Sequence, residues 1–310
     1  MAAIKKLVRW AQVEMRGEEV TPNPCLALAS AESLAWADAQ GLAVGSLALR
    51  RLEAIRCGSC AAHTYPSAPP EVVTLGAKLI TWLYLFDDAY GEGRDAADVR
   101  DLMATLASFE NVVRGARMPA RPTPFHRALL DLRTDCVAIA PSNAWIDRFG
   151  DSLARYFDGC VLESQFRTRG QAPTLTEYRR IRAWSIGTFP VFDLIELATR
   201  TDVELDPELD AIRERAALLC AWVNDVYSFR KEQKDGETLN LVALLAREYE
   251  IDVGAAFQVA TEVFNTDLVV FEEDARALSE RRRDAAPYVA GLRDWVHGNY
   301  TWTALCRRYP

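Results

Sequence analysis

The sequence predicts an all-α fold, and its composition and patterning both lead to this prediction. Half of the 310 residues are apolar, which is enough to fill one large core. Ala, Leu, Arg and Glu recur at spacings of three and four residues, with little of the strict alternation typical of strands. No Gly/Ser-rich linker, repeat or low-complexity block divides the chain, so we expect residues 1–310 to form a single domain.

Prolines and glycines mark the expected ends of the helices. The first predicted helix has Pro24 in its first turn and Gly41 near its end. The proline-rich segment 119–124 is a loop within the fold, because helical periodicity resumes on both sides of it. From these signals we predict helices at 23–42, 46–56, 96–113 and 239–248.

Charge and cysteine content argue against several functions. The net charge of −8 disfavours a nucleic-acid partner, because phosphate backbones are bound by a surplus of Lys and Arg. Seven cysteines in apolar contexts predict reduced thiols in a cytoplasm. Cys57 and Cys60 have C-x-x-C spacing, but there is no second pair and the chain has only three histidines, so no zinc site is expected.

The sequence also predicts a soluble protein. The N-terminal residues lack the sustained apolar region of a secretory signal. The longest apolar run is interrupted by Lys78 and falls short of the roughly 20 residues that a membrane span needs.

Three oxygen-bearing side chains recur at every fourth residue in the segment 222–232: Asn224, Ser228 and Glu232. Four residues of α-helix advance by about 400°, so these side chains form a narrow stripe on one helix face. An amide oxygen, a hydroxyl and a carboxylate suit Mg²⁺ better than a soft metal. Asp225 points about 100° away from this stripe, and we expect it to be solvated or paired with a surface arginine.

A second acidic motif follows the apolar run 73–86, which ends abruptly at Asp87 and Asp88, with Glu92 four residues later. Adjacent carboxylates at the end of a buried helix repel each other and are costly to desolvate unless they share a cation. The motif therefore predicts a metal site. Lys231 adds a cation on nearly the same side of its helix as Asn224, which makes sense if an anion such as diphosphate lies between the two.

The segment after Pro173 predicts a helix that is broken in its middle. Thr174 or Thr176 can cap its start, whereas Gly187 and Pro190 interrupt it. Proline removes one backbone hydrogen bond and clashes with the preceding turn. A broken helix of this kind exposes carbonyl oxygens inside the core.

Together, the acidic motif at 87–92 and the motif at 224–232, in this order and followed by a terminal Arg308-Tyr309, resemble the paired metal motifs of bacterial class I terpene synthases. The resemblance implies a helical bundle with a central active-site cavity. It also implies an enzyme, a carbon-oxygen lyase that ionises a linear isoprenoid diphosphate and cyclises the carbocation to a terpene hydrocarbon or alcohol. By this resemblance farnesyl diphosphate is the expected substrate, with geranyl and geranylgeranyl diphosphate as alternatives.

The resemblance assigns roles to individual residues. It implies three Mg²⁺ ions, with Asp87 the main ligand for two of them and the 224–232 stripe holding the third; Asp88 and Glu92 act either as ligands or as orienting partners. In the broken helix it implies that Arg182 senses the diphosphate, rather than Arg179 or Arg180. It further implies that Ser185 is a linker and Ile186 the carbonyl donor. The residues expected to donate hydrogen bonds to the diphosphate are Arg182, Lys231, Arg308 and Tyr309.

The carbocation needs a dry pocket with aromatic faces. We expect Tyr84, Phe189 and Trp302 in its wall, although aromatic residues on helices also serve ordinary packing. Two other functions stay open at this stage. A chain-elongating prenyl diphosphate synthase would carry a second Asp-rich motif where this chain has Asn224 and Ser228. A non-catalytic helical interaction protein would need no Mg²⁺. Assembly into a homodimer is also left open.

Overall fold

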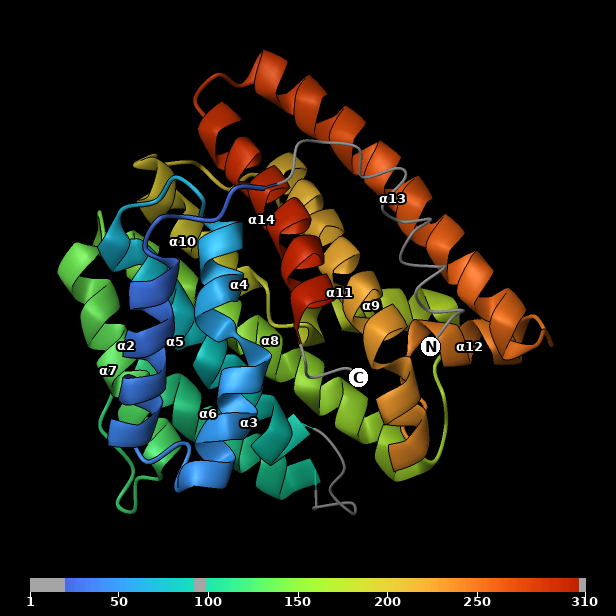
Figure 1. The fold of residues 1–310 in the computed structure, drawn as a ribbon, viewed down its shortest axis with the longest axis horizontal. Coiled ribbons are helices and arrows are strands. Elements are labelled where there is room, and N and C mark those ends of the chain that lie inside the picture. Colours follow the sequence, from blue (N-terminus) through green and yellow to red (C-terminus); the bar gives the residue numbers. More distant parts are fainter. Residues whose placement is uncertain (1–19, 92–98, 307–310) are drawn as a thin grey trace.

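The computed structural model describes residues 20–91 and 99–306, and in these ranges the chain is helical, which confirms the predicted all-α fold (Figure 1). In chain order the elements are α2 (Leu26–Ala39), α3 (Ser46–Ile55), α4 (Cys57–Thr64), α5 (Pro70–Phe86), the π-helical turn η1 (Asp87–Gly91), α6 (Val99–Val113), α7 (Pro124–Ile139), α8 (Asn143–Arg169), α9 (Leu175–Ser185), α10 (Phe189–Thr199), α11 (Pro207–Asp235), α12 (Leu241–Glu248), α13 (Val253–Arg281) and α14 (Ala286–Leu305).

Side-chain capping determines where α9 and α11 begin. The Thr174 hydroxyl accepts a hydrogen bond from the Glu177 backbone N–H at 3.2 Å, and the Glu177 carboxylate accepts one from the Thr174 N–H at 2.9 Å. This reciprocal capping box starts α9 and confirms Thr174 as the cap. Asp206 caps α11 by accepting a hydrogen bond from Leu209 N at 2.8 Å, with Pro207 at the first helical position.

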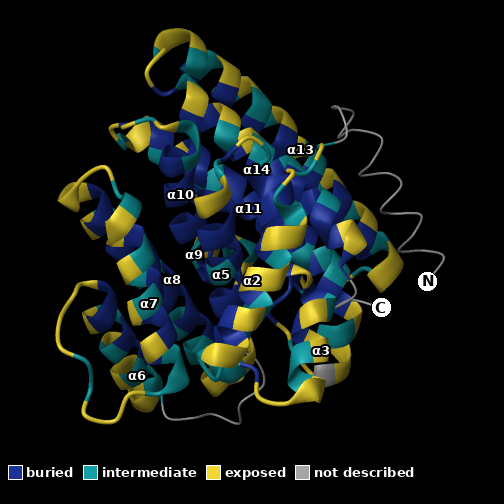
Figure 2. Cartoon of the chain, turned by 60° about the vertical axis from the view of Figure 1, so that its left-hand side comes forward, coloured by how far each residue is buried: buried dark blue, intermediate teal, exposed yellow. Residues whose placement is uncertain are grey.

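The helices surround a shared interior. α5 packs on α4 and α2, α8 packs on α9, and α11 packs on α13 and α14. α13 runs along one outer edge in Figure 1, whereas Figure 2 shows buried faces turned inward around α5, α8, α10 and α11. One part of the core is aromatic: the Trp82 ring stacks on Phe86 with centroids 4.7 Å apart, and Phe109 packs edge-on against both. Phe86 also packs against Tyr156 and Phe157, so the end of α5 lies against α8.

The segment around Cys57 forms a helix for which the sequence analysis made no assignment. α4 begins directly after α3 because Arg56 adopts a left-handed conformation, with φ of 62°. A single left-handed residue redirects the chain without a glycine or proline signal. Cys57 and Cys60 are buried in α4, and all seven cysteines are free thiols.

The charged run 279–284, for which the sequence predicts a solvated helix face, is mostly exposed, but only residues 279–281 are helical. α13 ends at Arg281, and the side chain of Arg281 pairs with Glu208 in the first turn of α11. Arg282 pairs with Asp206 at 2.8 Å. The run therefore links the end of one long helix to the start of another.

No helix in the described part of the chain is long and apolar enough to cross a bilayer.

Candidate active site

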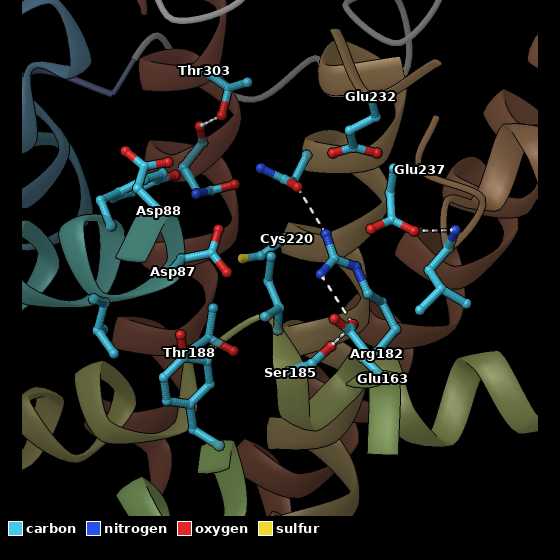
Figure 3. A pocket seen from close by; sticks show the side chains of 18 of the residues that line it. Asp87, Asp88, Glu163, Arg182, Ser185, Thr188, Cys220, Glu232, Glu237 and Thr303 are labelled. Atoms are coloured by element: carbon cyan, nitrogen blue, oxygen red, sulfur yellow. Dashed lines mark hydrogen bonds and ion pairs between the residues drawn. The ribbon is translucent and has the colours of Figure 1, made fainter. Parts of the chain in front are cut away.

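The helices enclose a cavity of about 840 Å³ that the predicted site residues share. Its walls come from the end of α5, from α8 and α9, from the middle of α11 and from the last turns of α14 (Figure 3). Polar side chains line both sides of the cavity (Figure 3). Aliphatic and aromatic side chains also line it, including Ile80, Leu83, Val191, Trp295 and Trp302.

One wall carries Asp87 and Asp88, which both line the cavity. They open η1, a π-helical turn that directly continues α5, so the apolar helix carries these carboxylates to the cavity edge. In Figure 3, Asp87 and Asp88 lie on the opposite side of the cavity from Arg182 and Glu232. The structure thus shows this acidic motif where the sequence predicts it, at the end of a buried helix.

The facing wall is formed by α11. Asn224 and Glu232 line the cavity, and Ser228 is buried one turn from each. Ser228 Oγ makes no hydrogen bond with the described residues, although it lies close enough to Glu232 to help lower the pKa of that carboxyl. Burial has the larger effect and, together with the charge of Asp225, raises the pKa of Glu232 to about 7.

These oxygen donors fit hard divalent cations, because amide, hydroxyl and carboxylate oxygens are the ligands such ions take. A buried hydroxyl without a hydrogen-bond partner, as at Ser228, is costly. The buried carboxyl of Glu232 accepts from Asn240 Nδ2 at 2.8 Å, yet burial still raises its pKa. Within the described residues, no three Asp, Glu, His or Cys side chains form a metal cluster of their own. The donors are instead divided between two walls, an arrangement that suits cations held jointly by protein and an anionic ligand.

Arg182 joins α9 to α11 beside this second wall. Its Nη2 donates to Asn224 Oδ1 and to Asp225 Oδ1, both at 2.7 Å, and its Nε donates to Asp225 Oδ1 at 3.0 Å. Asp225 also accepts from Tyr178 Oη at 2.7 Å and from Leu241 N at 2.8 Å. Asp225 is fully buried, so the expectation that it is solvated or paired with a surface arginine is wrong. Its carboxylate instead anchors Arg182.

Arg179, an alternative to Arg182, lies elsewhere. It pairs with Asp267 on α13 at 3.0 Å and does not line the cavity. The other alternative, Arg180, is likewise not among the residues of the cavity wall. Of the three arginines, the structure brings Arg182 to the site.

The break between α9 and α10 lies in the cavity wall, at residues 186–188. Gly187 has φ of +74°, which side chains rarely adopt, and an added Cβ there would meet the Tyr156 ring at 3.2 Å. Pro190 has no N–H to offer the Ile186 carbonyl, four residues earlier. The Ser185 hydroxyl donates a short hydrogen bond to Glu163. The predicted break is confirmed, and it leaves the Ile186 carbonyl without its helical donor.

Several residues of the site were missed from the sequence. Arg167 on α8 donates to Glu237 at 2.6 Å, to Glu163 at 3.1 Å and to the carbonyl of Gly91 at 3.2 Å. It therefore connects the acidic turn η1 with the loop after α11. Glu163 and Arg167 are spaced i, i+4 on one helix, but many surface pairs share this spacing, so it is a weak signal.

The expected aromatic wall is only partly found. Tyr84 and Trp302 line the cavity with ring centroids 5.7 Å apart. Phe189 is not in the wall: its ring lies beneath the guanidinium of Arg155, 4.6 Å from the centroid, and that of Arg213, at 5.2 Å. The residue begins α10, where its side chain turns towards these arginines rather than into the cavity.

Lys231 is half-buried on α11 and is not among the lining residues. Three other predicted residues, Glu92, Arg308 and Tyr309, lie outside the described ranges.

A comparison with family models identifies this arrangement. Residues 78–268, more than half of the chain, match the model described as terpene synthase family 2, C-terminal metal binding. The chain belongs to the terpene synthase family. The matched span contains Asp87, Asp88 and the 224–232 stripe, and with the all-α fold it makes the protein a class I terpene synthase that binds a divalent metal.

Curated terpene synthases resemble the chain over most of its length. It is 29% identical to a (+)-T-muurolol synthase of Roseiflexus castenholzii, over 89% of this chain and 87% of the relative. It is 30% identical to a (−)-β-caryophyllene synthase of Saccharothrix espanaensis, over 89% and 82% respectively.

Solved terpene synthases share the fold. A linalool/nerolidol synthase from Streptomyces clavuligerus superimposes with a TM-score of 0.81 at 24% identity, covering 91% of this chain and all of that one. An α-eudesmol synthase superimposes with a TM-score of 0.79 at 21% identity, covering 92% and 96%.

Proposed function

We propose that this terpene synthase ionises farnesyl diphosphate with the help of three Mg²⁺ ions and cyclises the resulting cation to a sesquiterpene. One observation carries the proposal: two walls of oxygen donors, at Asp87–Asp88 and at 224–232, face each other across a cavity that aromatic and aliphatic side chains also line. The choice of farnesyl diphosphate is supported by the muurolol and caryophyllene synthases, which are both named as cyclising it. We propose further that residues 1–310 act as one domain in a cytoplasm, as the free cysteines suggest.

The residues that would hold the cations are those of the two walls. Asp87 is the main ligand on its side, with Asp88 and Glu92 as ligands or orienting partners. Asn224, Ser228 and Glu232 hold a cation on the other side. When bound, Mg²⁺ draws electron density from the diphosphate oxygens and so helps the carbon–oxygen bond to break with its electron pair passing to diphosphate.

Arg182 couples binding to the reaction. Its Nη2 donates to Asn224 Oδ1 at 2.7 Å, so a cation held at that oxygen would compete with the guanidinium for it. We expect the guanidinium to turn away when the cation binds. Once turned, the planar fork of Arg182 donates to the diphosphate while Asp225 still pairs with its Nε side. Lys231, Arg308 and Tyr309 are the further donors that we propose, and Ser185 connects Arg182 to the break.

The break and the apolar wall act on the carbon chain. The Ile186 carbonyl has no helical donor, so its partial negative charge is available to stabilise a nearby cation. Tyr84 and Trp302 present aromatic faces, and the indole N–H of Trp302 is engaged by the carbonyls of Ile55 and Arg56 at 3.0 and 3.1 Å. With its N–H occupied, Trp302 offers the cation a ring rather than a polar group.

The test is to incubate the purified protein with Mg²⁺ and, in separate reactions, geranyl, farnesyl and geranylgeranyl diphosphate. Diphosphate release and volatile products are measured together, the latter by mass spectrometry. We expect a cyclic C15 product from farnesyl diphosphate and none after chelation of Mg²⁺. Elongated prenyl diphosphates as products, or no diphosphate release from any substrate, would contradict the proposal.

A further inference from the structure

The Thr188 side chain is a buried hydroxyl in the cavity wall that the fold does not use. It is 5% exposed, lines the cavity, and its Oγ1 has no hydrogen-bond partner among the described residues. We propose that the Thr188 hydroxyl holds a water molecule that attacks the cyclised cation, so that the enzyme makes a terpene alcohol. This inference rests on the proposed function and adds to it how the reaction ends.

The position of Thr188 makes its free hydroxyl unusual. It is the residue before α10, where a threonine side chain normally accepts a hydrogen bond from the first turn, yet it makes no such cap. Its backbone carbonyl alone serves the turn, accepting from Phe192 N at 2.9 Å. By contrast, Thr174 caps α9 through its hydroxyl. The hydroxyl of Thr188 therefore contributes nothing to starting the helix.

Other buried threonines donate their hydroxyl hydrogen to a backbone carbonyl. Thr303 also lines the cavity, but its hydroxyl donates to the Asn299 carbonyl at 2.8 Å. Thr81 on α5 donates to the Ala77 carbonyl at 2.8 Å. A buried hydroxyl left without a partner costs about 1–3 kcal/mol, whereas valine has nearly the same shape and no such cost. Threonine at 188 thus points to a polar ligand from within the cavity.

Water is the ligand that the surroundings of Thr188 favour. Leu83 and Val191 line the cavity near the break, so a charged ligand would be poorly solvated there. A buried water needs two or more polar partners. Besides Thr188 Oγ1, the carbonyl of Ile186, two residues earlier in the chain, lacks its helical donor and offers a second polar partner. In Figure 3, Thr188 lies on the same side of the cavity as Asp87.

The released diphosphate accepts the proton that is lost when water adds to the cation. The water oxygen donates a lone pair to the cationic carbon and forms a carbon–oxygen bond. The resulting oxonium then loses one proton to the diphosphate anion, leaving a neutral alcohol. Thr188 makes one hydrogen bond with the water throughout, as donor or acceptor, and is not itself consumed. No oxidant or reductant is required.

The experiment compares the products of the wild type, Thr188→Val and Thr188→Ser from farnesyl diphosphate and Mg²⁺ in water enriched in ¹⁸O. For the wild type we expect an alcohol that carries ¹⁸O. For Thr188→Val we expect the ratio of alcohol to hydrocarbon to fall by about tenfold or more, the effect of losing one hydrogen bond to the attacking water. Thr188→Ser should retain the alcohol because it keeps the hydroxyl.

Thr303→Val is the matched control, because it removes a hydroxyl from the same cavity that already has a protein partner. Its ratio of alcohol to hydrocarbon should match the wild type. Three results would each overturn the water site in proteins that still release diphosphate. They are an unchanged ratio in Thr188→Val, an equal fall of the ratio in Thr303→Val, and a wild type that makes only hydrocarbons. Loss of all turnover in the wild type contradicts the proposed function itself, so the two failures are distinguished.

Discussion

At the scale of single residues, Arg182 and Asp225 form a buried ion pair that connects α9 to the second wall of oxygen donors. The guanidinium donates to Asp225 through two nitrogens and reaches Asn224 with one of them. Bidentate geometry of this kind depends on the planar fork of arginine, which lysine does not have.

We therefore predict that Arg182→Lys lowers turnover by about tenfold or more with a smaller change in KM, because the charge remains but its geometry is lost. Steady-state diphosphate release measures both constants. Arg179→Ala is the comparison, since Arg179 pairs with Asp267 outside the cavity and should leave turnover close to the wild type. Loss of turnover in Arg179→Ala with a normal Arg182→Lys would reverse the assignment.

The proposed metal ligands give a second prediction. Asp87→Ala and Asn224→Ala should each reduce turnover by more than the roughly 100-fold that loss of an orienting partner costs. Circular dichroism should show an unchanged helical fold, because neither side chain is part of the buried core. Glu71→Ala removes an exposed carboxylate from the same helix as the apolar run before Asp87, and it should retain activity. Wild-type rates in Asp87→Ala or Asn224→Ala are incompatible with the proposed ligands.

At the scale of secondary-structure elements, the break between α9 and α10 is the feature on which the site most depends. Gly187 has φ of +74° and lies against the Tyr156 ring. Gly187→Ala should lower the free energy of unfolding by about 1–3 kcal/mol, through backbone strain and through displacement of the ring. Turnover should fall as well, because the Ile186 carbonyl and Thr188 shift with the backbone.

Gly41→Ala separates strain from site effects. Gly41 also has a positive φ, of +72°, but an added Cβ there meets nothing closer than 3.9 Å, and the residue is remote from the cavity. It should lose stability and keep its turnover. Chemical denaturation and diphosphate release on both variants check this, and equal turnover losses would mean that the break has no special role.

Several elements and one stripe of oxygen donors could be predicted from the sequence because short-range signals specify them. The four-residue spacing of Asn224, Ser228 and Glu232, and the combination of Gly187 with Pro190, are readable without a fold. Contacts between distant segments cannot be read from the sequence in this way. Arg167 joins η1 to the loop after α11, and only the packing of α8 against both reveals it.

Other errors came from side-chain direction. Phe189 lies beside the break in sequence, but its ring turns to Arg155 and Arg213 once α10 has started. Asp225 was correctly placed off the stripe, yet its environment depended on where Arg182 lies in three dimensions. The helix α4 was not predicted because the left-handed residue before it, Arg56, is not the glycine that usually marks such a turn.

At the scale of the whole molecule, the divided donor walls predict that ligand binding and stability are linked. Neither wall forms a carboxylate cluster of its own within the described residues, so Mg²⁺ alone should raise the melting temperature only slightly. Mg²⁺ with diphosphate should raise it more, since a ligand at about 100 times its Kd stabilises the folded state by about 2.7 kcal/mol. Differential scanning fluorimetry measures the shift, and Asn224→Ala should lose most of it. An equal shift with Mg²⁺ alone would argue against joint binding.

The central claim is that the two walls hold cations around one diphosphate, and a crystal structure with Mn²⁺ and diphosphate tests it most directly. Anomalous scattering locates Mn²⁺ independently of the other atoms. We expect anomalous peaks beside Asp87 and beside Asn224, Ser228 and Glu232, with a diphosphate between them and the Arg182 guanidinium turned from Asn224 towards it. Mn²⁺ at one wall only, or a diphosphate bound outside the cavity with Arg182 still donating to Asn224, would contradict the account.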